Sequence, residues 1–388
     1  MAFGSIMSQK PNVYTDDEVL TDETKAIYGL GPEAVPDDVF IILGIGAGKY
    51  GYGITVTYPD GTPAANLPVS GVTDRLGQPI TTNDKGYFLA VSTEKSITFS
   101  IVSPYFDVNN LSNQVVNFES IVTKKKIAFA EKTYTNYILI RSSQTIQFFK
   151  DRMVDFTAVG GGGGSLGWSK NQGTSYGAGS AGGGGGYVAT VLNSLIKKGE
   201  KIQLNIGAGG QILSPSTAGK YGGGQGGYTQ VIALKENTPI VTANGGFGGN
   251  GYINQRGDSD YEHEIYSGGA GNGAGGSRRD PGAYSQGLAN NGTDATGFIF
   301  NEQSLGLAGG GGGGAGAVRS NSTGGAVWIV TQGGKPFGAK GAAYKDSWNI
   351  EVYAPTGPGG GAGGSLGDAN KSGLQPSGAS GGVYIRWK

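Results

Sequence analysis

The only histidine of the chain, His263, lies within the acidic segment 258–264. A serine hydrolase would need this histidine as its general base, and the clustered carboxylate oxygens could hold calcium. The segment lacks the spacing of an EF-hand loop, and the sequence singles out no carboxylate pair for glycoside cleavage. We therefore interpret it as a solvated polar loop and predict no enzyme activity, no catalytic residue and no metal site.

A formal G-x-G-x-x-G motif occupies residues 46–51 and follows the apolar run 39–45. A dinucleotide site needs a helix directly after this motif, because the helix N-terminus binds the pyrophosphate. Here the alternating, strand-like segment 54–58 follows, and Lys49 precedes Tyr50 rather than the Ser or Thr of a phosphate-binding loop. We predict that the protein binds no cofactor.

Aromatic residues recur in the polar stretches between the glycine runs of the C-terminal half, including the long stretch 252–292. Aromatic rings offer contact area at low entropic cost, and neighbouring Ser, Gly and Asn adapt their hydrogen bonds. Flat rings also stack on sugar faces, so these loops could bind a ligand; the alternative is that they cover the edges of the fold or a subunit interface. The candidate binding residues are Trp168, Tyr176, Tyr252, Tyr261, Tyr266, Tyr284, Trp348 and Tyr353.

Glycine is concentrated in the part of the chain that must position these loops, since 65 of the 77 glycines follow residue 156. Unbroken runs occur at 160–164, 182–186 and 309–314, and strand-like segments such as 187–192, 201–206, 228–234, 240–243, 326–331 and 382–388 lie among the runs. Flexible linkers lack such apolar segments, so we predict a folded region. A three-residue-per-turn glycine helix makes no internal hydrogen bonds, and its amides need neighbouring runs as partners. We therefore predict packed polyglycine helices.

Composition excludes several other classes of protein. The 29 basic and 29 acidic residues balance, which argues against a nucleic-acid partner. There is no cysteine, which suits assembly in a reducing cytoplasm. The N-terminus shows no secretory signal, and the longest apolar run, 39–45, is far too short to span a bilayer, so we expect no membrane insertion.

The predicted organisation is all-β, with three parts. Residues 1–45 are polar and acidic and form an attachment segment, with a short helix opening at Thr21. Residues 46–130 contain short alternating segments separated by turns such as Pro59-Asp60-Gly61, which predicts a small β-sandwich. Residues 131–388 form the glycine-rich domain.

Three groups of motifs resemble known families. The stretch GTPAANLPVSGVT, followed by TTNDKGYFLAVS, resembles small Ig-like or transthyretin-like sandwiches. The succession VDFTAVGGGGGS, GKYGGGQGGYTQV, GLAGGGGGGAGAV and GASGGVYIRWK resembles the glycine-rich C-terminal domain of bacteriophage tail fibres and adhesins. The leader VLTDETKAIYGLGPEAVPDDVFIILG resembles N-terminal segments of tail fibre proteins from phages or phage-tail-like particles. The short tail adhesins of contractile phages lack the sandwich.

The resemblance implies a receptor-binding adhesin in the tail fibre or tail tip of a virion, made in the host cytoplasm. Residues 1–45 would attach it to a baseplate or fibre protein, and its loops would bind a bacterial surface glycan or protein. Fibres of this kind usually present three copies, so a homotrimer is expected, and several copies would convert weak contacts into avidity. A head fibre, collar or decoration protein without receptor binding is the open alternative.

Overall fold

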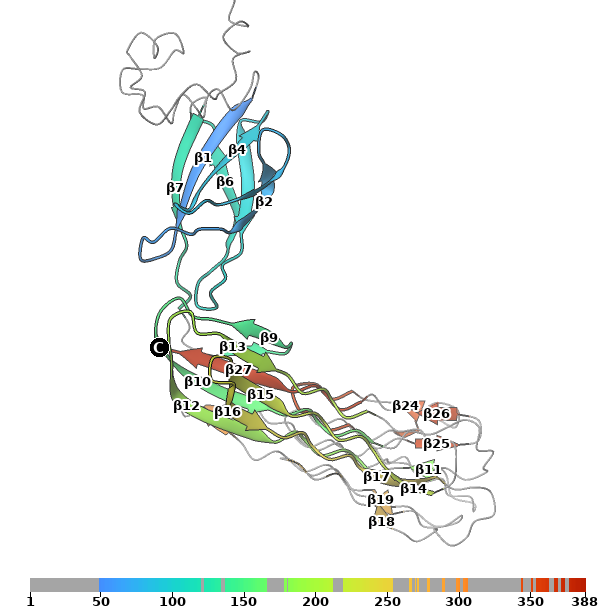
Figure 1. Ribbon diagram of the computed structural model, residues 1–388. Helices are drawn as coiled ribbons and strands as arrows, with labels where there is room; N and C mark the ends of the chain where they lie inside the picture. Colours follow the sequence, from blue (N-terminus) through green and yellow to red (C-terminus); the bar gives the residue numbers. More distant parts are fainter. Residues whose placement is uncertain are drawn as a thin grey trace, which may run out of the picture. The chain divides into compact units, whose positions relative to one another are not determined.

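The computed structural model describes residues 49–119, 122–133, 137–165, 181–211, 219–253, 354–362 and 377–388, with short strands and single residues between them (Figure 1). The chain divides into two compact units, residues 1–133 and 134–388. Throughout these described ranges the regular elements are strands, and no helix is present that could cross a membrane. The predicted attachment segment 1–45 and its helix lie outside the described residues.

The first unit contains two sheets. One has the order β4-β1-β7, and the other has the order β3-β2-β5-β6. The strands are β1 (Tyr50–Thr57), β2 (Pro68–Thr73), β3 (Pro79–Thr81), β4 (Tyr87–Ser92), β5 (Ser96–Ile101), β6 (Leu111–Asn117) and β7 (Val122–Ala128). All pairs are antiparallel except β1 with β7. This all-β arrangement is consistent with the predicted sandwich.

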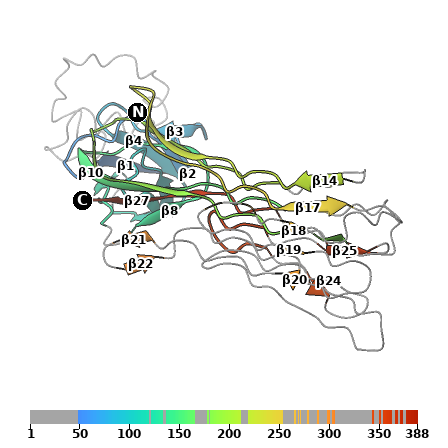
Figure 2. The same cartoon turned by 90° about the horizontal axis from the view of Figure 1, so that it is seen from below.

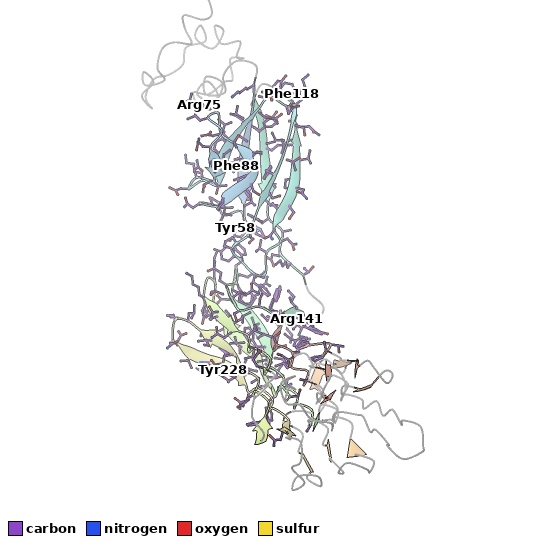
Figure 3. All side chains as sticks on the ribbon, turned by 90° about the vertical axis from the view of Figure 1, so that its right-hand side faces the viewer. Tyr58, Arg75, Phe88, Phe118, Arg141 and Tyr228 are labelled. Carbon is purple, nitrogen blue, oxygen red and sulfur yellow. The ribbon has the colours of Figure 1, made fainter. Side chains whose placement is uncertain are left out.

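Alternating side chains from the two sheets make the core of this unit. Phe88 of β4, which is labelled in Figure 3, and Phe99 of β5 are both buried. Their ring centroids lie 5.3 Å apart in an edge-to-face contact. Because these strands belong to different sheets, the contact places the two sheets face to face. The predicted turn after β1 also forms: Gly61 has a φ of 84°, and its amide donates to the carbonyl of Tyr58.

The second unit begins with two four-stranded sheets, of order β12-β10-β27-β8 and β16-β15-β13-β9. The strands are β8 (Ile138–Ile140), β9 (Gln144–Ile146), β10 (Arg152–Val159), β12 (Val188–Ile196), β13 (Ile202–Asn205), β15 (Thr229–Ala233), β16 (Thr238–Ala243) and β27 (Gly382–Trp387). Both sheets contribute side chains to the buried apolar core, among them Phe156, Leu204, Val231 and Ile385. The C-terminal strand lies inside its sheet, between β10 and β8.

Glycine runs lead from these sheets to a second set of short strands (Figures 1 and 2). That set includes β11 (Ala178–Gly179), β14 (Gly219–Gly222), β17 (Asn250–Ile253), β18 (Ile265–Tyr266), β19 (Arg278–Arg279), β20 (Leu288–Ala289), β25 (Leu366–Asp368) and β26 (Lys371–Gly373). The predicted strand 326–331 and the glycine run 309–314 lie outside the described residues. The remaining short strands are β21 (Phe298–Phe300), β22 (Gln303–Leu305), β23 (Ala343–Tyr344) and β24 (Ile350–Glu351).

Packed polyglycine helices are not seen as helical elements. The described glycine runs are in neither helix nor strand, and their backbone hydrogen bonds go almost entirely to other runs rather than along the same run. A helix that bonds internally is therefore absent from them.

Candidate binding platform

Seven glycine-rich segments lie together in the second unit, and we call the assembly the glycine core. Its members are run I (160–164), run II (181–187), run III (207–211), run IV (223–228), run V (244–249), run VI (357–362) and run VII (378–381). Six of them begin or end within two residues of a strand, so the sheets of the unit bring these six to one place; run VI lies in the chain between β24 and β25.

Run I is the centre of the glycine core, and all five of its amides donate to neighbouring runs. Gly160 and Gly163 donate to run II at 2.9 and 2.8 Å. Gly161 and Gly164 donate to run IV at 2.9 and 2.8 Å, and Gly162 donates to run VII at 2.8 Å. The partner of an amide therefore repeats after three residues, and three successive amides point to three different runs.

The carbonyls of run I accept from the other three runs. Gly161 and Gly164 accept from run V at 2.8 and 2.9 Å, again three residues apart. Gly162 accepts from run III at 2.7 Å, and Gly163 accepts from run VI at 2.9 Å. Run I is thus hydrogen-bonded to six neighbours, whereas a strand inside a sheet has two.

The six outer runs also bond to one another and close a ring. Going round, run III bonds to IV, IV to V, V to II, II to VI, VI to VII and VII back to III, through backbone hydrogen bonds of 2.7–3.0 Å. Since amide and carbonyl groups that lose water must find partners, this ring explains how a segment without side chains can be buried.

Glycine is required at run I for space. A Cβ built on any of Gly160, Gly161, Gly162, Gly163 or Gly164 would come within 3.0 Å of a backbone atom of a neighbouring run. Backbone atoms cannot move aside as the end of a flexible side chain can. Even alanine is therefore too large at the centre of the glycine core.

The strands determine which runs meet. Between β10 and β12, Val159 lies opposite Val188, and the next bond of the same register joins Gly160 to Tyr187. The β15–β16 register, in which Thr229 lies opposite Ala243, continues unchanged through runs IV and V into the β14–β17 pair. Facing sheets normally lie about 10 Å apart because side chains fill the gap. Without side chains, run I approaches run IV to hydrogen-bonding distance.

A buried ion pair joins the C-terminal strand β27 to β10 near the start of the glycine core. Arg386 of β27 donates to the carboxylate of Asp155 of β10 at 2.7 Å, with side chains 12% and 6% exposed. The same carboxylate accepts the amide of Asn193 at 2.7 Å, where β12 takes a φ of 55° beside a break in register. One acidic side chain therefore connects three adjacent strands.

The structure places two of the eight predicted binding residues. Tyr252 lies in β17 opposite Lys220, at the end of the register that runs through IV and V, and Tyr266 lies in β18 opposite Arg278. The other six lie outside the described residues: Trp168, Tyr176, Tyr261, Tyr284, Trp348 and Tyr353. Tyr252 and Tyr266 belong to different two- and three-stranded sheets beyond the glycine runs.

Neither the G-x-G-x-x-G motif nor the acidic segment around His263 forms a site among the described residues. Tyr50 and Gly51, which end the G-x-G-x-x-G motif, lie in β1, so the motif runs directly into a strand. The acidic segment around His263 lies outside the described residues. Within the described part of the chain, no group of three His, Asp or Glu side chains is placed to hold a metal ion.

A family model described as a glycine-rich domain matches residues 141–388. The chain belongs to this glycine-rich domain family. The match fits the predicted glycine-rich C-terminal domain. No curated protein matches the sequence. Among solved structures, the chain is similar to BcpA, the major pilin subunit of Bacillus cereus, with 7% identity over 86% of this chain and 95% of that chain. The TM-score of 0.18 is too low for this likeness to carry an argument.

Sequence reasoning missed two exposed aromatic residues on the glycine core itself. Tyr228 of run IV is 59% exposed and Phe247 of run V is 48% exposed. A signal was present: in the sequence NGGFGGN, residues 244–250, every third residue carries a side chain. The three-residue repeat of hydrogen-bond partners explains this spacing, because only one position in three faces away from the neighbouring runs.

Proposed function

We propose that the seven runs are three-residue polyglycine helices packed as a lattice, and that this lattice is the rigid stem of a receptor-binding adhesin. The repeat of hydrogen-bond partners after three residues supports the helices, since a three-residue turn returns each amide to the same side. A stem whose amides are paired on all sides would hold the segments beyond it in fixed positions.

The observation that carries the adhesin role is the ring of six runs around run I, with strands at both ends. The register that starts in β15 and β16 continues as far as Tyr252 in β17. The candidate aromatic residues would thus be displayed from a preorganised support, which lowers the entropic cost of binding. Residues 46–130 would serve as an Ig-like or transthyretin-like stalk.

The particle context follows from the sequence resemblance alone. We propose that the protein is a tail fibre or tail-tip component of a phage or phage-tail-like particle, and that residues 1–45 attach it to a baseplate or fibre protein. Assembly as a homotrimer would present three copies of the stem, so that weak contacts to a bacterial surface glycan or protein add up to avidity.

Binding of the fluorescently labelled full chain to intact bacterial cells tests the adhesin role. We expect saturable binding that is weakened when Tyr252 is replaced by alanine. Immunogold labelling of purified particles gives an independent readout, with labels expected at the tail. Labels on the capsid, or failure of the chain to bind any host strain that the particle infects, would favour the purely structural alternative.

A further inference from the structure

The outer surface of runs IV and V carries a regularly spaced array of uncharged side chains. Run IV presents Gln225 and Tyr228, and run V presents Asn244 and Phe247, with Asn250 following in β17. All five are exposed. We call them the amide–aromatic face; Figure 3 labels Tyr228, which lies just before β15.

The backbone register pairs these side chains across the two runs. Gly226 donates to Gly246 and Gly223 donates to Gly249, each at 2.9 Å. This antiparallel register places Tyr228 alongside Asn244 and Gln225 alongside Phe247. Each of the two aromatic rings therefore has a primary amide as its neighbour on the adjacent run.

The spacing along each run leaves open surface between the side chains. Outward-facing residues are three apart, which is about 9–10 Å whether the run rises as a polyglycine helix or as a strand. The glycines between them have no side chains to fill that surface. Both rings can therefore be approached from the side as well as from above.

The chemistry of the face extends along the same layer. Gln230 of β15 and Thr242 of β16 continue the register and are joined by a hydrogen bond of 3.1 Å between their side chains. On runs III, IV and V, the exposed side chains that the structure describes include amides, two aromatic rings and alanine, and none is charged.

We infer that the amide–aromatic face is a binding site for an uncharged polysaccharide. This inference rests on the proposed adhesin function and names the ligand class and a second location for binding. Amide groups both donate to and accept from sugar hydroxyls, and exposed rings pack against the C–H faces of sugar rings. A face without cations gives an anionic polymer no charge-assisted hydrogen bonds.

A second copy of the chain is a poorer occupant. Stable homomeric interfaces bury a predominantly apolar centre, whereas amides here separate the two rings. The rigidity of the underlying runs instead suits a polar ligand, because the amides need no ordering of the backbone when they bind.

The test uses the full chain on an array of uncharged bacterial polysaccharides and their anionic counterparts. We expect binding to at least one uncharged polysaccharide, weakened about tenfold by Phe247→Ala and by Tyr228→Ala, because each change removes one stacking ring. Phe247→Tyr keeps the ring and should keep the affinity. Leu192→Ala is the matched control, since Leu192 is 56% exposed but belongs to β12 rather than to runs III, IV or V.

Three outcomes would overturn the inference: binding to anionic polysaccharides alone, no binding to any polysaccharide, or equal binding by wild type and both alanine variants. Binding to cells, measured in parallel, separates this result from the adhesin role. If the wild-type chain and both variants bind cells equally, the adhesin role is supported, but the amide–aromatic face is not the site that binds the cells. If the wild-type chain binds uncharged polysaccharide but no cells, the adhesin role fails and the face remains a glycan site.

Discussion

The sandwich of the first unit and the glycine core of the second unit both exclude water from their interiors, but they do so by opposite means. In the sandwich, side chains such as Phe88 and Phe99 fill the space between two sheets, and the backbones stay apart. In the glycine core, run I has no side chains and its backbone touches six other backbones. Burial of apolar side chains stabilises the first arrangement, whereas satisfied amide and carbonyl groups must hold the second together.

Glycine itself has different roles in the two regions. In the first unit, Gly61 and Gly77 have φ values of 84° and 78°, and a Cβ at either would meet nothing within 4 Å. These glycines are needed for backbone conformation. In run I, glycine is needed for space. Adding a side chain to the centre of the glycine core should therefore destabilise the second unit, and removing a buried side chain from the sandwich should destabilise the first unit.

The largest effect is expected for Gly162→Ala at the centre of run I. The new Cβ would overlap the carbonyl of Gly360 of run VI, and neither backbone can shift without breaking hydrogen bonds to other runs. We expect a loss of more than about 4 kcal/mol in the free energy of unfolding of the second unit. Calorimetry of the full chain, in which each unit can melt separately, measures this loss.

Gly77→Ala in the first unit is the matched control for that experiment. It adds the same methyl group at a turn where only the positive φ resists it, so the cost should be about 1 kcal/mol. If Gly162→Ala proved no worse than Gly77→Ala, the runs would not be as closely packed as their hydrogen bonds require.

Removing a side chain should rank the two regions in the opposite order from adding one. Phe99→Ala removes a ring that is 1% exposed and should destabilise the sandwich by about 3–5 kcal/mol, because a cavity remains between the sheets. Phe247→Ala removes the same ring from the surface of the glycine core and should change stability by less than about 0.5 kcal/mol. Chemical denaturation with a probe in each unit measures both; comparable losses would contradict the contrast.

These two regions also differ in how far the sequence predicts them. Alternating apolar residues and turns such as the one at Gly61 predict most strands of the sandwich, because in a strand the polarity of each side chain indicates which face of the sheet it occupies. A glycine run carries no such pattern. Its partners are decided by the register of the strands that feed it, such as Val159 opposite Val188, and strand pairing is a long-range choice that the local sequence does not encode.

The same reasoning applies to the candidate site. Loop composition singled out Tyr252, which the structure places at the end of the register shared by runs IV and V. It passed over Tyr228 and Phe247, because they lie inside glycine runs rather than in loops. Their three-residue spacing becomes meaningful only when the hydrogen-bond partners of the runs are known.

A third prediction concerns the junction between strands and glycine runs in the second unit. Arg386→Met leaves the carboxylate of Asp155 buried without its cation and should cost about 3 kcal/mol. Lys197 and Asp151 form an exposed ion pair, with side chains that are 63% and 51% exposed. Lys197→Met breaks this pair and should leave the unfolding midpoint nearly unchanged. Urea denaturation compares the two variants; equal midpoints would show that the buried pair does not hold β27 in place.

The smallest difference between the units is expected at high pH, where each has a buried tyrosine with a strongly raised pKa. Burial raises the pKa of Tyr58 in the first unit and of Tyr384 in the second from 10.0 to about 12, with a smaller contribution from the neighbouring tyrosine, Tyr105 or Tyr137. The folded protein holds both phenols neutral, so their contribution to stability is complete below pH 10 and declines as the pH rises towards 12. Tyrosinate absorbance during an alkaline titration should show late-titrating groups, with one fewer in Tyr58→Phe and one fewer in Tyr384→Phe. Should all tyrosines instead ionise together near pH 10, burial would hold neither Tyr58 nor Tyr384 neutral, and the two units would not share a buried phenol. A late-titrating group that is lost only in Tyr58→Phe or only in Tyr384→Phe would instead extend the contrast between the units from their backbones to their side chains.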